Sequence, residues 1–113
     1  MSRYYILDAN GDPVPCDVRT WGEWFERTSR TRERIIAHDR DEGPGGVEIL
    51  VSTVFLGLDV TLNGPPVLWE TMVLGGLLDG FQIRYTSRAD AFRGHQEICR
   101  QVSESIHPKK DET

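Results

Sequence analysis

LWETMVLGGLLDG, residues 68–80, decides the fold, because an apolar strand pattern runs directly into a glycine-rich turn. The segment after the turn, FQIRYTS at residues 81–87, alternates Phe81, Ile83 and Tyr85 with polar side chains. Such alternation is typical of a half-buried strand, so the two segments predict an antiparallel hairpin. A one-residue slip would turn the apolar residues to solvent, and the pattern therefore also predicts the register.

Glu70 is the unexpected residue of this hairpin, because the segment around it is otherwise apolar. If Thr71 pairs with Ile83, Glu70 lies opposite Arg84 on the neighbouring strand. A cross-strand pair of opposite charges contributes about 0.2–1 kcal/mol when it is exposed. A catalytic carboxylate would instead need a partner acid, base or metal ligand, and the sequence shows none at a recognised spacing. We therefore predict an ion pair between Glu70 and Arg84.

Three further strands are predicted upstream of this hairpin. VEILVSTVFLGL, residues 47–58, is apolar on both faces, as expected of a central strand. Residues 33–39 are shorter and more charged, which is typical of an edge strand. RYYIL, residues 3–7, predicts an N-terminal strand that ends in a turn at Asn10 and Gly11.

CDVRTWGEWFERTSR, residues 16–30, changes to the period of an amphipathic helix. Asp17 or Thr20 could cap this helix, and we place its start at Asp17 and its end near Ser29. Its aromatic residues share one face and should be buried. They are Trp21, Trp24 and Phe25.

A second helix is predicted for SRADAFRGHQEICRQVSESIH, residues 87–107. Ser87 and Asp90 fit a capping box, and Pro108 would end the helix. Its buried stripe is predicted to contain Phe92, Cys99, Val102 and Ile106.

The expected order is therefore β-α-β-β-β-β-α. Short turns between consecutive strands favour antiparallel pairing. We expect an α+β fold with a single antiparallel sheet of about four or five strands and two helices packed on one face. Residues 1–107 should form a single globular domain, and residues 108–113 a solvated C-terminal tail.

The charge balance limits the classes of partner. The chain has 113 residues and a formal net charge of −5. This charge disfavours direct binding to nucleic acid, which requires Lys and Arg to displace counterions, and it disfavours an anionic membrane surface. It is compatible with a basic protein partner, although charge that serves only solubility explains it as well. Nothing in the sequence fixes the oligomeric state.

The cysteines and apolar runs indicate the compartment. Cys16 and Cys99 are isolated in sequence, as expected in a reducing cytosol. The N-terminal residues contain no basic start followed by a long apolar run, and no apolar run approaches the length of a membrane span. We therefore expect a cytoplasmic protein.

Two loops beside the apolar strands are the best candidates for binding. GLDVTLNGPP, residues 57–66, and GGLLDG, residues 75–80, are held by the predicted sheet, and functional residues concentrate on such loops. GGLLDG does not match a phosphate-binding loop, because no Lys-Ser or Lys-Thr and no helix follow it. The candidate binding residues are Asp59, Asn63 and Asp79 in the loops, with Glu70 and Arg84 on the hairpin.

His95 and Cys99 are the residues most suggestive of a metal. They lie four residues apart and share one face of the second predicted helix, a spacing that can hold zinc. A site needs at least one more ligand, and the sequence places neither Cys16 nor His38 beside them. We therefore expect His95 to be a hydrogen-bonded, half-buried histidine, with no metal and no cofactor.

Several blocks together resemble a group of small hypothetical proteins encoded by tailed phages and prophages. The blocks are YYILD, VSTVFLGLD, LWETMVLGG with LDG, and RYTSRADAFRGH, and they extend over nearly the whole chain. The resemblance carries no known activity or catalytic residue. It implies a phage or prophage gene product in a bacterial cytoplasm. In one place this chain differs from that group, because RDEGPGG at residues 40–46 makes a longer turn.

Two functions of different classes remain. The first is a non-catalytic accessory protein that binds a host protein, in one version an inhibitor of a host defence. The second is a small enzyme or ligand-binding domain that uses the loops at 57–66 and 75–80. An exposed apolar surface would favour the first, and a concave site with converging polar groups would favour the second. The small size, the acidic charge and the lack of a catalytic motif favour the first.

Overall fold

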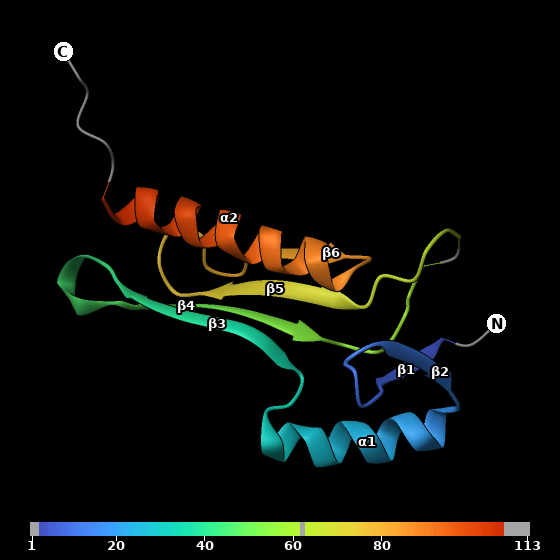
Figure 1. The fold of residues 1–113 in the computed structure, drawn as a ribbon. Helices are drawn as coiled ribbons and strands as arrows, with labels where there is room; N and C mark the ends of the chain where they lie inside the picture. The colour runs from blue at the N-terminus through green and yellow to red at the C-terminus, as the bar shows by residue number, and fades with distance from the viewer. Residues whose placement is uncertain (1–2, 62, 108–113) are drawn as a thin grey trace.

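The computed structural model describes residues 3–61 and 63–107, and it shows an α+β fold with two helices and two antiparallel sheets (Figure 1). The predicted fold class is therefore confirmed. The elements are β1 (Tyr4–Leu7), β2 (Pro13–Cys16), α1 (Val18–Thr31), β3 (Ile35–Glu42), the 3₁₀ turn η1 (Pro44–Gly46), β4 (Glu48–Phe55), β5 (Trp69–Leu74), β6 (Gln82–Tyr85) and α2 (Arg88–Ile106).

The main sheet has the strand order β3-β4-β5-β6, so β4 and β5 are central, as the sequence predicts for residues 47–58. In the β5–β6 hairpin, Thr71 pairs with Ile83 and Glu70 pairs with Arg84. The predicted register is therefore confirmed. Gly75 and Gly76 at the turn both have positive φ, and a Cβ on Gly75 would lie 2.3 Å from the Glu48 carbonyl oxygen. Only glycine fits that position without strain.

Helix α2 covers the face of this sheet that carries the odd-numbered β4 residues. Helix α2 lies along the sheet (Figure 1), and its Ile98 and Val102 pack with Val51 and Val73. Helix α1 lies beside the β1–β2 hairpin and meets the sheet at the end of β4, where Trp24 contacts Phe55 edge to face at 5.7 Å. The even-numbered residues of β4 keep partial exposure.

The helix ends follow the capping chemistry that the sequence predicts. Asp17 is the N-cap of α1 and accepts a hydrogen bond from the Thr20 backbone N–H at 2.7 Å. Ser87 caps α2 by accepting from the Asp90 N–H at 3.1 Å. Helix α1 ends at Thr31, two residues beyond the expected Ser29, because Arg32 in the left-handed region closes its last turn.

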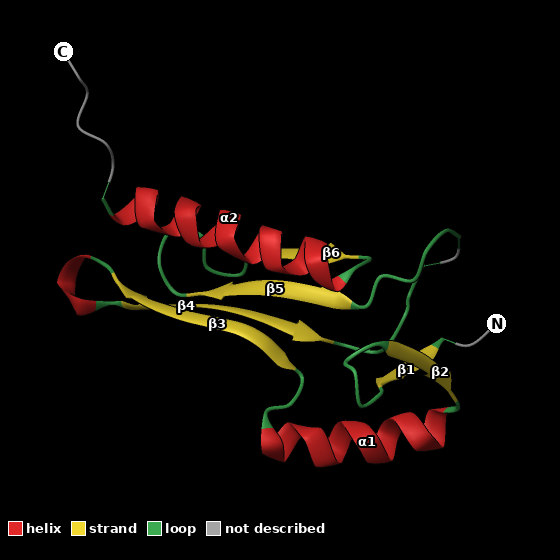
Figure 2. Cartoon of the chain, in the orientation of Figure 1, coloured by secondary structure: helices red, strands yellow, loops and turns green. Residues whose placement is uncertain are grey.

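The N-terminal strand differs from the expectation of a single sheet. It pairs with β2 in a separate two-stranded sheet, and the hairpin lies beside α1 (Figure 2). The sequence did not predict β2, because it contains Pro13 and Pro15, which cannot donate to a ladder. They are tolerated here because β2 pairs on one side only. A bridge between Tyr4 and Leu58 joins the hairpin to the segment that follows β4.

Two details correct the sequence-based expectations. Strand β3 extends to Glu42, beyond the expected Asp39, because it pairs with β4 along its whole length. Phe92 is 39% exposed and is not part of the buried stripe, which contains Ala91, His95, Ile98 and Val102. The predicted tail at 108–113 lies outside the described residues.

None of the helices in the described ranges has the length and apolar character needed to cross a membrane.

Candidate functional site: a cleft with two unmatched donors

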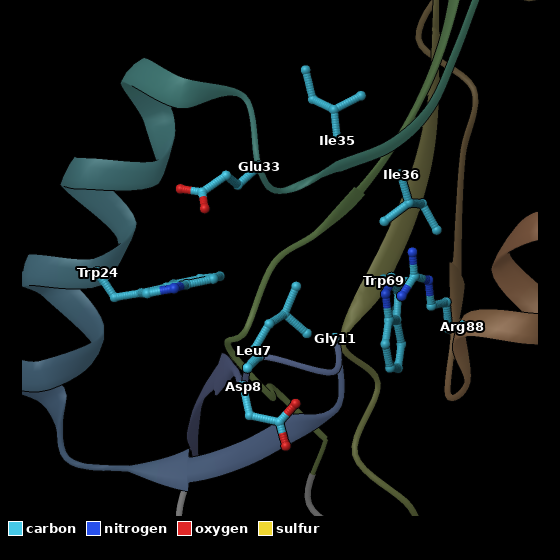
Figure 3. Close-up of a pocket in the computed structure, with 10 residues that line it drawn as sticks. Leu7, Asp8, Gly11, Trp24, Glu33, Ile35, Ile36, Trp69 and Arg88 are labelled. Atoms are coloured by element: carbon cyan, nitrogen blue, oxygen red, sulfur yellow. The ribbon is translucent and has the colours of Figure 1, made fainter.

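A cleft of about 350 Å³ opens where the β1–β2 hairpin, α1 and the main sheet meet (Figure 3). The hairpin turn forms one side, α1 and the start of β3 form another, and β5 with the start of α2 forms the third. The lining residues are Leu7, Asp8, Ala9, Gly11, Trp24, Glu33, Ile35, Ile36, Trp69 and Arg88.

The aromatic core fixes the walls of this cleft. Phe55, which is fully buried at the end of β4, lies between the two tryptophans. Its ring centroid is 5.7 Å from that of Trp24 and 5.3 Å from that of Trp69, and both contacts are edge to face. Edge-to-face pairs add about 0.5–1.5 kcal/mol beyond the area that they bury. The positions of Trp24 and Trp69 are therefore set by packing before any ligand binds.

Trp69 carries an unmatched hydrogen-bond donor. The residue is 3% exposed, and its indole Nε1–H is buried without an acceptor within the described part of the chain. By contrast, Trp21 donates its Nε1–H to the Leu56 carbonyl oxygen at 3.3 Å. A buried donor without an acceptor costs about 1–3 kcal/mol, so a wall residue in this state is suited to bind an acceptor from outside.

Arg88 is the second unmatched donor. It is the first residue of α2, directly after the Ser87 cap, and its side chain reaches the cleft. Within residues 3–61 and 63–107, Arg88 forms no ion pair, and its guanidinium lies 5.5 Å from the Phe92 ring. A Cβ on Gly11 would lie 2.6 Å from an Arg88 nitrogen, so the bare hairpin backbone leaves room for the guanidinium.

The two carboxylates of the cleft already have partners. Asp8 accepts hydrogen bonds from the backbone N–H groups of Asn10 and Asp12, at 2.8 and 3.0 Å, and so shapes the hairpin turn. Glu33 accepts from the Thr31 hydroxyl at 2.6 Å and lies 3.7 Å from Arg27. Among the described side chains that line the cleft, Trp69 and Arg88 are therefore the donors without a protein acceptor. Figure 3 shows Trp69 and Arg88 on one side of the cleft, opposite Trp24 and Glu33. This arrangement suits an anionic group that is attached to an apolar body.

Glu70 forms an ion pair within the β5–β6 hairpin. Its Oε2 accepts a hydrogen bond from Arg84 Nε at 2.9 Å, which confirms the predicted ion pair. The Glu70 side chain is 9% exposed and that of Arg84 is 43% exposed. A half-buried position makes the pair more important to stability than an exposed one, because removal of Arg84 would leave a carboxylate largely out of water.

The two loops predicted to bind lie at opposite ends of β5 (Figure 1). They do not form one continuous surface, because the whole strand separates them. Asp59 holds the first loop: it accepts from the Thr61 hydroxyl at 2.6 Å and from the Val67 N–H at 3.3 Å, and these bonds lower the pKa of Asp59. Asp79 holds the second by accepting from the Gly75 N–H at 2.7 Å. Asn63 is exposed.

His95 lies in a chain of hydrogen bonds through the core. Its Nε2 is 2.6 Å from Asp39 Oδ2, and its Nδ1 is 2.7 Å from the Thr53 hydroxyl. Thr53 contacts Thr71 at 2.5 Å, and Tyr85 donates to Thr71 at 3.0 Å. The chain resembles a catalytic Asp-His-hydroxyl arrangement, but its hydroxyl residue, Thr53, is fully buried. The bond from His95 holds the pKa of Asp39 below its usual range.

Sequence reasoning missed the residues that define the cleft. Tyr85 was predicted to lie on the apolar face of its strand, but the unmatched indole N–H of Trp69 depends on contacts that no local pattern shows. The sequence feature that could have pointed to Arg88 is its position directly after the Ser87 helix cap.

Comparisons with protein-family models, curated proteins and solved structures found no match to this chain.

Proposed function

We propose that this chain is a non-catalytic binding protein whose cleft receives a carboxylate side chain from the surface of a protein partner. The observation that carries the proposal is the pair of unmatched donors, Trp69 Nε1–H and Arg88, in one cleft. A carboxylate accepts from an indole N–H and from a guanidinium at the same time, and charge-assisted bonds of this kind are the strong ones.

The size and opening of the cleft suit one residue of a partner. Trp24, Ile35 and Ile36 provide an apolar surface beside the donors, which would contact the stem of the entering side chain. Arg88 is exposed, and its guanidinium lies 5.5 Å from the Phe92 ring. A change of its rotamer would admit the carboxylate to the Trp69 N–H.

The charge of the whole chain supports a partner with a basic surface. The net charge of −5 would attract such a surface and accelerate association. Within the cleft, the carboxylates of Asp8 and Glu33 already have partners, and Arg88 is the cation that an entering carboxylate would meet. One carboxylate within a basic partner surface would therefore fix the register of the complex, which is the usual contribution of charged pairs to specificity.

The uncovered face of the main sheet supports binding to a protein. Leu50, Val54 and Met72 point away from α2 and are partly exposed, and Leu74 beside them is 48% exposed. An apolar surface held on a rigid sheet is typical of a protein-interaction face.

The sequence resemblance supplies the biological context of the proposal. In this context the chain would be a phage or prophage accessory protein in a bacterial cytoplasm. Its partner would be a host protein, and inhibition of a host defence would be one outcome of binding. A role in direct nucleic-acid binding is disfavoured by the net charge. The buried state of Thr53 supports a role without catalysis.

The experiment is a comparison of charge-reversed variants in partner capture. Tagged wild-type protein and the Arg88→Glu variant are incubated with bacterial lysate. Each captured protein is then purified, and its affinity for the wild-type chain and for the variant is measured by calorimetry. Arg93→Glu is the matched control, because Arg93 lies on the same helix, is exposed, and is outside the cleft. We expect Arg88→Glu to weaken binding by at least roughly tenfold, equivalent to about 1.4 kcal/mol, and Arg93→Glu to change it little.

Equal binding by all three proteins would remove the cleft from the interface. Capture of a small organic acid in place of a protein, detected by mass spectrometry of the purified chain, would favour the alternative of a ligand-binding domain. Turnover of any substrate that is abolished by Glu70→Gln would contradict the non-catalytic proposal.

A further inference from the structure

A second group of polar side chains lies away from the cleft, where α2 crosses the edge strand β3. Asp39 pairs with Val51 and so lies on the inner face of the sheet, below α2. His95 and Cys99 are one turn apart on the facing side of α2. One ligand atom from each of Asp39, His95 and Cys99 lies within 4.8 Å of the other two.

The distances within this group are those of side chains that can share one ion. His95 Nε2 is 2.6 Å from Asp39 Oδ2, and Cys99 Sγ is 3.6 Å from the same oxygen. Ligand atoms around a tetrahedral zinc lie about 3–4 Å apart, given bond lengths of about 2.0–2.3 Å. The Asp39 side chain is 63% exposed, so it can move the short distance that opens the space for an ion.

The donor set is one that zinc prefers. It contains an imidazole nitrogen, a thiolate sulfur and a carboxylate oxygen, each of which is a common zinc ligand. An alkaline-earth ion would need more oxygen ligands than this group provides. A cavity of about 150 Å³ adjoins Asp39 and Cys99, and Asp41 also lines it. The fourth coordination position would face this cavity, open to water or to Asp41.

The surroundings of His95 are those of a metal-binding histidine. The ring is 3% exposed, and the Thr53 hydroxyl at 2.7 Å from Nδ1 holds its orientation. Metal-bound histidines almost always donate their other ring N–H to a nearby acceptor, which Thr53 provides. Thr53 is itself held by Thr71. A core network thus positions His95 Nε2 toward Asp39 and Cys99.

We propose that Asp39, His95 and Cys99 bind one zinc ion, which joins α2 to the edge strand β3. The sequence alone favoured no metal, because it offered no third ligand, and the structure provides Asp39 as that ligand. On binding, the Cys99 thiol loses its proton to solvent and its sulfur bonds to zinc. The proton of the neutral imidazole then resides on Nδ1, where it is donated to Thr53, and Nε2 bonds to the ion.

The test uses the full chain after treatment with chelator, under reducing conditions. Calorimetric titration with zinc chloride should give one ion per chain and a higher melting temperature. Titration with cobalt chloride should give the near-ultraviolet absorption of thiolate-bound cobalt. Cys99→Ser should abolish that absorption and weaken zinc binding by at least roughly tenfold, and Asp39→Asn should weaken it by a similar factor.

Cys16→Ser is the matched control and should keep the absorption and the affinity, because Cys16 lies on the β1–β2 hairpin, outside the zinc site. Neither Cys99 nor Asp39 is buried, so both variants are expected to fold. The proposal is overturned if the wild-type chain takes up no stoichiometric zinc, or if cobalt absorption persists in Cys99→Ser. The zinc site is separate from the cleft, so either proposal can fail without the other.

Discussion

Glu70 and Arg84 face each other across β5 and β6, and Arg84 donates to the Glu70 carboxylate at 2.9 Å. The acid is the more buried partner, and the arginine covers it from solvent. This relationship answers the question that the apolar strand raises: the carboxylate stabilises the hairpin.

The first prediction concerns this pair. Arg84→Ala should lower the free energy of unfolding by about 1–3 kcal/mol, because it leaves a largely buried carboxylate without its cation. Arg93→Ala is the control, since Arg93 pairs with Asp90 on the exposed surface of α2, and it should cost less than about 1 kcal/mol. Urea unfolding measures both, and equal losses would contradict the structural importance of the Glu70 pair.

The second prediction concerns the hydrogen-bond chain in the core. Thr53→Val keeps the shape of the side chain but removes the hydroxyl that links His95 to Thr71. We expect a loss of about 1–3 kcal/mol, because His95 Nδ1 then stays buried without a partner. Thr53→Ser keeps the hydroxyl and serves as the control. If thermal unfolding shows the valine variant to be at least as stable as the serine variant, the network does not stabilise the fold.

The third prediction compares two helical glycines. A Cβ on Gly94 in α2 would lie 2.2 Å from the Tyr85 ring, whereas a Cβ on Gly22 in α1 would have no neighbour within 4 Å. Gly94→Ala should destabilise the protein by about 1–3 kcal/mol through overpacking. Gly22→Ala should stabilise it by up to about 1 kcal/mol, because alanine favours a helix. Melting temperatures that move in the same direction for both variants would contradict the close packing of α2 on Tyr85.

The fourth prediction concerns pH and the loop at 57–66. The bonds from Thr61, followed by that from Val67, hold the pKa of Asp59 below its usual value. The stability from the ionised Asp59 is therefore fully present above the unfolded-state pKa and is lost as pH falls through the lower folded-state pKa. In an NMR acid titration, the Thr61 and Val67 amide resonances should move together with the ionisation of Asp59. Asp59→Asn should remove this transition, and its persistence in the variant would contradict the assignment.

Periodicity and pairing chemistry made much of the fold predictable. The alternation of residues 81–87 fixed the β5–β6 register, and the Asp17 and Ser87 caps located the helix starts. Strand β2 was missed because proline normally argues against a strand, and tertiary context allows it where one side stays unpaired. Phe92 was misplaced because helical spacing alone does not show which of two adjacent stripes meets the sheet.

The candidate sites were less predictable, because they depend on contacts between distant segments. Asp39 and His95 are 56 residues apart and meet only when α2 crosses β3. The sequence predicted that Asp39 lies on an edge strand, but it showed neither the face on which Asp39 lies nor the position of the helix above it. The unmatched Trp69 N–H likewise follows from the packing around one indole.

The most direct test of the central claim, that the cleft binds a carboxylate, is NMR of the Trp69 indole N–H. The probes are N-acetyl-aspartate amide and its neutral counterpart N-acetyl-asparagine amide, each added to the full chain at millimolar concentration, with a Trp69→Phe variant to assign the resonance. We expect the carboxylate to shift this resonance, the amide to leave it unchanged, and Arg88→Gln to abolish the shift. An indole resonance that stays in place, or that moves equally with both probes, would show that the cleft does not bind a carboxylate.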